Sequence, residues 1–151
     1  MSTAKAAILQ NISKISDELD ELEIVERLYM LSRLEHSKRR CCEEGTVSQN
    51  NGKRKHPYEL EWSPDAIVDL DTAGIAADEF RQQAKALRKN PEKGTVIPEI
   101  GDEHFRELRY KMCNIVYEIR ETSILVHEIY EKHLVFNRSI NKLACSELLD
   151  T

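Results

Sequence analysis

A polar run at residues 48–57 constrains this chain more than any other feature, because the hydrophobic pattern differs on its two sides. The run, SQNNGKRKHP, has the composition of a linker. Before it, apolar residues recur at helical spacing, and after it the pattern shifts in stages towards the period of two that is typical of strands. Lys53–His56 could bind nucleic acid, but solvated linker is the preferred interpretation. The chain of 151 residues therefore divides into an arm, 1–47, a linker, 48–57, and a small domain, 58–136.

Residues 4–44 have the pattern of an amphipathic helix. Ile8, Ile15, Leu22 and Tyr29 recur every seven residues, and no Pro or Gly occurs before Gly45. We expect two helices, broken near residues 15–19, rather than one long helix. One apolar face of this arm needs a partner.

The domain that follows is predicted to be α+β. Residues 58–62 alternate like a strand and stop at Ser63-Pro64, a pair suited to begin a helix. Helical spacing then continues to about Lys89, with an interruption near residues 72–74. Residues 105–109, 114–120 and 123–130 are expected to be antiparallel strands joined by tight turns. The remainder, 137–151, is predicted to be a tail or short helix.

Composition narrows the class of protein. The net charge of −5 argues against simple nucleic-acid binding, and no apolar run is long enough to span a membrane. We expect a cytoplasmic protein with no membrane partner. The four cysteines lack metal-ligand spacing, so neither a metal nor another cofactor is predicted.

Three segments of the domain together resemble the RelE/ParE toxins of bacterial type II toxin–antitoxin systems. They are YELEWSPDAIVDL at 58–70, ALRKNPEKG at 86–94 and FRELRYKMCNIVYEIRETSILVHEIYEKH at 105–133. The resemblance implies a strand, two helices and then an antiparallel sheet. It also implies growth inhibition, an antitoxin partner and no cofactor. RelE-like members cut mRNA on the ribosome, whereas ParE-like members poison DNA gyrase without cleavage chemistry.

The resemblance also suggests site residues, with two departures. Catalytic candidates are Arg109, Lys111, Tyr130, Lys132 and His133. Asn114 stands where the family commonly has Arg, and Glu131 places a carboxylate where RNA phosphate would bind. RNA-binding candidates form a basic stripe at helical spacing, although a solvated helix face explains them equally well: Arg81, Lys85, Arg88 and Lys89.

The arm has a resemblance of its own. LEIVERLYMLSRLEHSKRRCCEEGTVSQ at 22–49 is similar to the toxin-binding end of small antitoxins. It implies an apolar contact with the toxin domain through Leu22, Val25, Leu28, Tyr29, Leu31 and Leu34. Acidic residues are expected to meet a basic toxin surface: Asp17, Glu18, Asp20, Glu21, Glu23 and Glu26. The alternatives are a homodimer through these helices, or an arm that completes the domain's core.

Three hypotheses follow from the sequence. The chain is a ribosome-dependent mRNA endonuclease with a degenerate site, a gyrase-poisoning toxin, or an inactive member retained for binding an antitoxin. Self-restraint by the arm is compatible with each activity. Asn114, Glu131 and the acidic balance count against the endonuclease.

Overall fold

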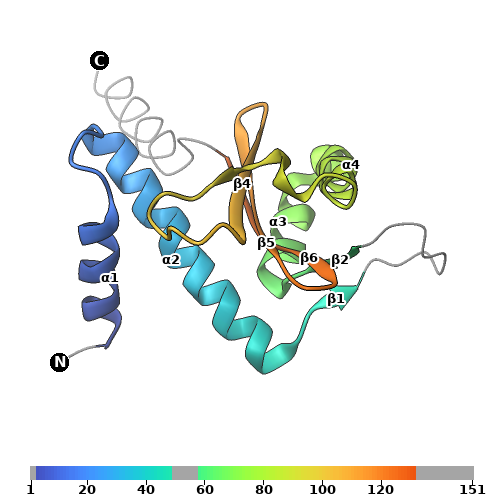
Figure 1. Ribbon diagram of the computed structural model, residues 1–151, viewed down its shortest axis with the longest axis horizontal. Helices are drawn as coiled ribbons and strands as arrows, with labels where there is room; N and C mark the ends of the chain where they lie inside the picture. Colours follow the sequence, from blue (N-terminus) through green and yellow to red (C-terminus); the bar gives the residue numbers. More distant parts are fainter. Residues whose placement is uncertain (1–2, 49–57, 132–151) are drawn as a thin grey trace, which may run out of the picture.

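The structure is a computed structural model that describes residues 3–48 and 58–131. Four α-helices, two 3-10 turns and six strands follow one another along this part of the chain (Figure 1). Their bounds are α1 Thr3–Lys14, α2 Glu21–Glu44, β1 Val47–Ser48, β2 Glu59–Trp62, α3 Pro64–Ala73, η1 Gly74–Ala76, α4 Ala77–Leu87, η2 Pro91–Lys93, β3 Thr95–Val96, β4 Phe105–Tyr110, β5 Cys113–Ile119 and β6 Ser123–Glu131. Predictions for the linker after Ser48, for Lys132 and His133, and for the tail 137–151 lie outside the described residues.

One mixed sheet organises the domain, and the α+β prediction is confirmed. The strand order is β1-β2-β6-β5-β4-β3. All neighbours are antiparallel except β2 and β6, which pair in parallel over residues 59–62 and 123–126. The parallel pair and the short edge strand β1 were not predicted. β2 can pair in parallel with β6 because α3 and α4 carry the chain across one face of the sheet before the antiparallel strands β4, β5 and β6 form.

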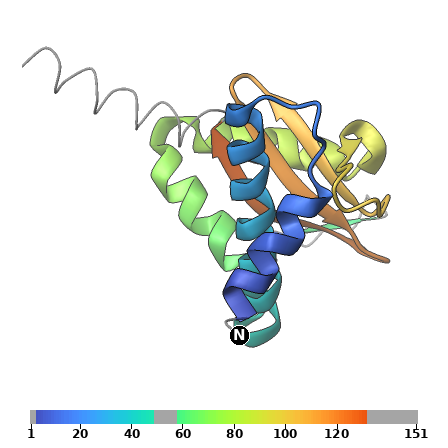
Figure 2. The ribbon, with the colours of Figure 1, turned by 90° about the vertical axis from the view of Figure 1, so that its left-hand side faces the viewer.

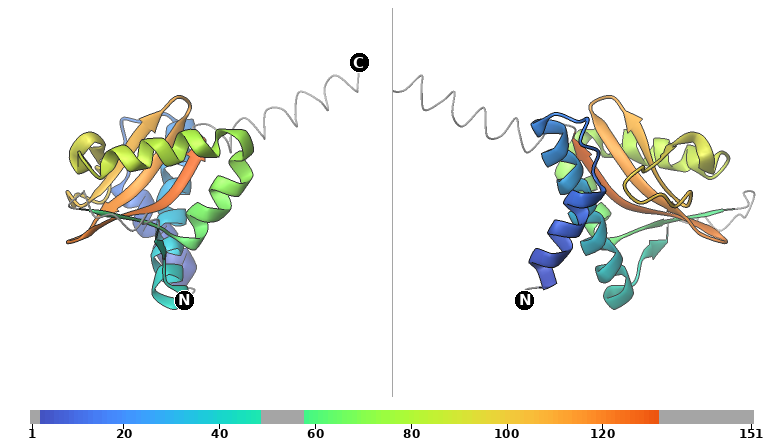
Figure 3. Two further views of the ribbon diagram at one scale, coloured as in Figure 1. Left: turned by 90° about the vertical axis from the view of Figure 1, so that its right-hand side faces the viewer. Right: turned by 60° about the vertical axis from the view of Figure 1, so that its left-hand side comes forward.

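Helices cover both faces of the sheet. α3 and α4 pack on one face, while α2 crosses the other with α1 on its outer side (Figures 2 and 3). The first face is built around Trp62, Phe80 and Tyr117. The second is built around Met30 and Leu34 of α2, packed against residues such as Val116. The central strand β6 is buried from Ser123 to Tyr130, as expected for a strand covered on both sides.

Local signals set the helix boundaries. The break expected near residues 15–19 is confirmed, since α1 ends at Lys14 and α2 begins after Asp20. The Asp20 carboxylate accepts a hydrogen bond from the Glu23 N–H at 2.8 Å, which caps α2. α2 ends at Gly45, whose φ of +81° suits glycine. Ser63 caps α3 as predicted, with its hydroxyl accepting from the Ala66 N–H at 3.0 Å. In the described ranges, no helix is both long and apolar enough to cross a membrane.

A β-bulge interrupts the pairing of β5 with β6. Val116 pairs with Glu128 but Tyr117 pairs with Val126, so His127 is an extra residue in β6. The bulge breaks the usual alternation of side chains. His127 and Glu128, although consecutive, both meet side chains of α2.

Candidate functional site

The candidate site is the surface of the domain against which α2 packs, which we call the arm-binding surface. It combines one sheet face with the adjoining side of α3. Its members are Asp65, Asp69, Ile97, Glu99, Phe105, Glu107, Val116, His127, Glu128 and Tyr130. The arm and domain are therefore joined by packing as well as by the chain, so the arm completes a second core of the folded structure.

The centre of this contact is apolar. Met30, Leu31 and Leu34 of α2 are at most 4% exposed and pack with Val116 and Tyr130. Burial of three such side chains contributes roughly 1.5–3 kcal/mol each relative to exposure. The apolar contact therefore supplies much of the free energy that holds α2 on the sheet.

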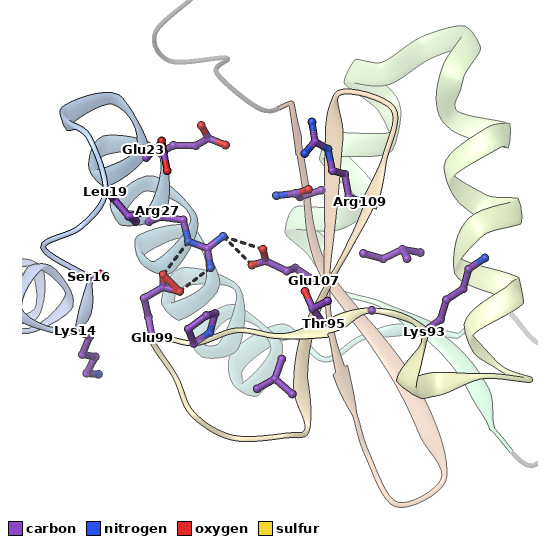
Figure 4. A pocket seen from close by; sticks show the side chains of 16 residues that line it. Lys14, Ser16, Leu19, Glu23, Arg27, Lys93, Thr95, Glu99, Glu107 and Arg109 are labelled. Atoms are coloured by element: carbon purple, nitrogen blue, oxygen red, sulfur yellow. Dashed lines mark hydrogen bonds and ion pairs between the residues drawn. The ribbon is translucent and has the colours of Figure 1, made fainter.

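Arg27 forms the first of three polar contacts around this centre (Figure 4). Its guanidinium donates two hydrogen bonds to Glu99, at 2.6 and 2.8 Å, and one to Glu107 at 2.9 Å. The side chains of Arg27 and Glu99 are 14% and 5% exposed. Burial alone would raise the pKa of Glu99, but the hydrogen bonds and charge of Arg27 outweigh it and lower that pKa. For Glu107 burial prevails, and its pKa is raised.

Arg33 forms the second contact, on the side of α3. It donates to Asp69 at 2.6 Å and lies 3.6 Å from Glu128. The Asp69 carboxylate also accepts a hydrogen bond from the Ile129 N–H at 2.9 Å. Ile129 lies in the part of β6 that extends beyond its pairing with β2. Glu128 is fully buried, and burial raises its pKa well above the ordinary range despite the nearby charge of Arg33. A buried carboxyl of this kind is costly unless it is protonated or paired.

The bulge residue His127 forms the third contact. Its Nδ1 lies 2.7 Å from the Ser37 hydroxyl of α2, and its Nε2 lies 2.8 Å from a Glu118 oxygen. Ser37 and His127 are fully buried. Burial lowers the pKa of His127 more than Glu118 raises it, so the neutral ring is favoured. The chain Ser37–His127–Glu118 resembles a nucleophile–base–acid triad, but its burial leaves no access for a substrate, and it serves here as a polar connection between arm and domain.

The sign of the charged contacts is the reverse of the expected one. The arm presents Arg27, Arg33 and Arg40 to carboxylates of the domain. Most of the acidic residues expected to make this contact are exposed in the α1–α2 turn or the first turn of α2. They are Asp17, Glu18, Asp20 and Glu21, with Glu23 half-buried and Glu26 buried. Negative charge near the N-terminus of a helix stabilises that helix. The sequence alone does not distinguish this local role from a role in binding the domain.

The predicted apolar contact is present in its C-terminal half. Leu31 and Leu34 are buried, and Leu28 and Tyr29 are partly buried against the same core. Leu22 and Val25 are 37% and 48% exposed and lie outside this core. Of the six apolar residues expected to make this contact, Leu22 and Val25 therefore take no part in the core that α2 shares with the domain.

Of the catalytic candidates that the structure describes, Arg109 and Tyr130 lie near each other on the sheet, while Lys111 lies apart from them. Arg109 pairs with Asn114, and Asn114 pairs with Tyr130, so these three lie side by side across β4, β5 and β6. Arg109 is exposed, whereas Tyr130 is buried beneath α2 and accepts a hydrogen bond from Asn114 at 2.8 Å. Burial raises the pKa of Tyr130. Lys111 turns away at the hairpin tip and pairs with Glu79 of α4 at 2.9 Å.

A cavity of about 830 Å³ remains between the arm and the sheet beside Arg109. Arg27 and Glu107 form one wall, and Glu23 and Arg109 flank it from opposite elements (Figure 4). Its charged lining has both signs. The described residues contain no group of three His, Cys, Asp or Glu side chains arranged to hold a metal ion.

The predicted RNA-binding stripe lies on α4 and the turn after it, across the sheet from Arg109 and Tyr130. Arg81 pairs with Asp78 at 2.8 Å, and Arg88 donates to the Tyr58 carbonyl at 3.1 Å. Lys85 is half-buried on α4, and Lys89 is exposed in the turn that follows this helix. The stripe therefore faces a different side of the domain from Arg109 and Tyr130.

The fold and the site define a class: a small α+β domain that carries a helical arm across its sheet. A family model described as the ParE toxin of the type II toxin–antitoxin system, parDE, matches residues 60–131. The domain formed by these residues belongs to this family, within the RelE/ParE superfamily, and is a toxin component of a type II toxin–antitoxin system. The family implies an antitoxin partner. No curated protein matches the chain.

Sequence reasoning missed the residues that join arm and domain, namely Arg27, Arg33, Ser37, His127 and Glu128. One signal was present in the sequence. His127 and Glu128 interrupt the otherwise apolar run Ile124–Tyr130. Consecutive polar residues inside a buried strand indicate either a bulge or a polar partner, and here both occur.

Proposed function

We propose that this chain is a toxin that binds and poisons DNA gyrase and is held inactive by its own α1–α2 arm. The occupation of the arm-binding surface by α2 carries the proposal. A target protein that needs this surface must first displace Met30, Leu34 and the three arginine contacts. Tethering raises the local concentration of the arm to roughly the millimolar range, so the closed state dominates even for a modest contact.

The charges of the surface favour protein binding over RNA cleavage. Removing the arm would leave Asp69, Glu99, Glu107 and Glu128 without their arginine partners. Carboxylates at this density oppose the approach of a phosphate backbone. The exposed Arg109 beside Asn114 is the observation that favours mRNA cleavage as a second candidate.

Expression in a bacterial host tests the proposal with four chains. They are the natural chain, residues 58–151, full-length Arg33→Glu and the matched control Arg39→Glu, which changes an exposed side chain of the same helix. We expect growth arrest with double-strand DNA breaks for the truncated chain and for Arg33→Glu only. Blocked translation with intact DNA would favour mRNA cleavage instead. Equal toxicity of natural and truncated chains would refute self-restraint, and harmlessness of all four would indicate an inactive interaction protein.

A further inference from the structure

The cavity of about 830 Å³ between the arm and the sheet has the size of a small-molecule site, for which roughly 300–1,000 Å³ is typical. Both parts of the chain bound it. The α1–α2 turn and the start of α2 form one side, through residues such as Leu19 and Glu23 (Figure 4). β4 and the segment 93–99 form the other side. A molecule bound in this cavity therefore contacts the arm and the domain at once.

Negative charge exceeds positive charge on the arm side of the cavity. Glu99 and Glu107 share the single guanidinium of Arg27. Arg27 donates a hydrogen bond to one oxygen of Glu107, whereas the buried Oε2 accepts none from the described residues. Glu23 lies one turn before Arg27 and takes part in no ion pair within the described ranges. Lys14, the other cation on this side, is exposed at the end of α1. This side therefore fits an ammonium group.

Positive charge lies on the opposite side. Thr95 pairs with Glu107 across the antiparallel strands β3 and β4. Lys93 and Arg109 are each two residues from this pair, toward the same end of the sheet, and both line the cavity (Figure 4). Both side chains are exposed, and in the part of the chain that the structure describes neither has a carboxylate partner. This side therefore fits an anionic group, either a carboxylate or a phosphate.

Apolar side chains contribute to the rest of the lining. They are Leu19, Val96, Pro98 and Leu108. A hydrocarbon chain between two charged ends of a ligand would be removed from water against them, which adds affinity. A polyamine would satisfy only the arm side of the cavity, and inorganic phosphate would satisfy only the opposite side.

We propose that this cavity binds a small dipolar molecule whose ammonium group lies near Glu23 and Glu107 and whose carboxylate or phosphate lies near Lys93 and Arg109. Its two ends contact arm and domain, so the complete site exists only while α2 lies on the sheet. Binding therefore stabilises the closed arrangement of the arm. The site itself is independent of the proposed function, and only its effect on bacterial growth rests on self-restraint by the arm.

Binding is measured by amide NMR spectra of the full, isotope-labelled natural chain. The amide of Gly94, which lines the cavity, is the reporter. The dipolar probes are ε-aminohexanoate and ω-aminohexylphosphonate, which distinguish a carboxylate from a phosphate-like group. Hexylamine, hexanoate and hexylphosphonate are the matched probes with one charged group each, and inorganic phosphate is the probe without an apolar chain.

We expect at least one dipolar probe to shift the Gly94 signal saturably. Its dissociation constant should be at least about tenfold lower than those of its two singly charged counterparts, because each charged end makes its own charge-assisted contact. Similar affinity of a dipolar probe and either counterpart would overturn the inference. Binding of inorganic phosphate as tight as that of the dipolar probes, or no binding of either dipolar probe, would also overturn it.

Two variants assign the ends of the ligand. Glu23→Gln should weaken the dipolar probe about tenfold and leave hexylphosphonate unchanged, whereas Arg109→Gln should weaken the dipolar probe and leave hexylamine unchanged. Glu43→Gln and Arg39→Gln are the controls, because both side chains are exposed on α2 outside the cavity lining. Equal weakening by a variant and its control would overturn the inference. Circular dichroism verifies folding, and the comparison of probes on the natural chain needs no variant.

The experiment separates the two proposals. Binding of a dipolar probe by a chain whose residues 58–151 do not arrest growth would keep the site and remove the proposed function. Growth arrest by residues 58–151, with no binding of either dipolar probe to the full chain, would do the opposite.

Discussion

Replacement of Arg27 by alanine should destabilise the chain by about 3 kcal/mol. Arg27 serves two carboxylates, and removing it leaves Glu99 and Glu107, 5% and 18% exposed, without their cation. Breaking a buried ion pair by deleting one partner costs about 3–5 kcal/mol. The lower end applies because both carboxylates line the cavity of about 830 Å³, which water can enter.

Urea unfolding followed by circular dichroism measures this cost. Arg39→Ala is the control on the same helix, because its side chain is exposed, and it should change the free energy of unfolding by no more than about 0.5 kcal/mol. A rescue variant combines Arg27→Met with Glu99→Gln and Glu107→Gln. It should recover most of the loss, since the penalty comes from uncompensated negative charge. Equal midpoints for Arg27→Ala and Arg39→Ala, or no recovery in the triple variant, would refute this reasoning.

Further predictions concern the bulge, one glycine and the buried phenol. Burial lowers the pKa of His127, so below about pH 6.5 the unfolded chain binds a proton at this residue that the folded chain does not bind. The free energy of unfolding should therefore fall as the pH drops through about 6.5. His127→Gln should reduce this pH dependence, as measured by urea unfolding across that range. Gly94→Ala would place a Cβ 2.6 Å from the Tyr117 hydroxyl and should cost about 1–3 kcal/mol in urea unfolding, partly regained with Tyr117→Phe. Tyr130→Phe removes the acceptor for Asn114 and should cost about 1 kcal/mol by the same measurement; no loss would mean that water replaces the bond.

Elements with local causes could be predicted from the sequence. Ser63 and Pro64 mark the start of α3, and the interruption near residue 74 appears as the turn between α3 and α4. Alternation locates β4, β5 and β6 to within a residue or two. These signals depend on backbone propensity and period, which neighbouring residues alone determine.

The site could not be predicted because its contacts are distant in sequence. Arg27 meets a carboxylate 80 residues away, and Ser37 meets a histidine 90 residues away. The stripe of α2 shows that it packs on something, but the side of the helix that carries Arg27 and Arg33 becomes the contact side only when the domain's carboxylates are in place. The bulge at His127 is equally hidden, because one extra residue in β6 is recognised only against the register of β5.

The parallel pairing of β2 with β6 has a consequence for the order of biosynthesis. Glu61 meets Leu125, so the sheet cannot close until the ribosome has delivered β6, long after α1 and α2 have emerged. A nascent chain therefore exposes its arm first and completes its arm-binding surface last. Each copy of that surface forms with a covering helix already attached to it in the same chain.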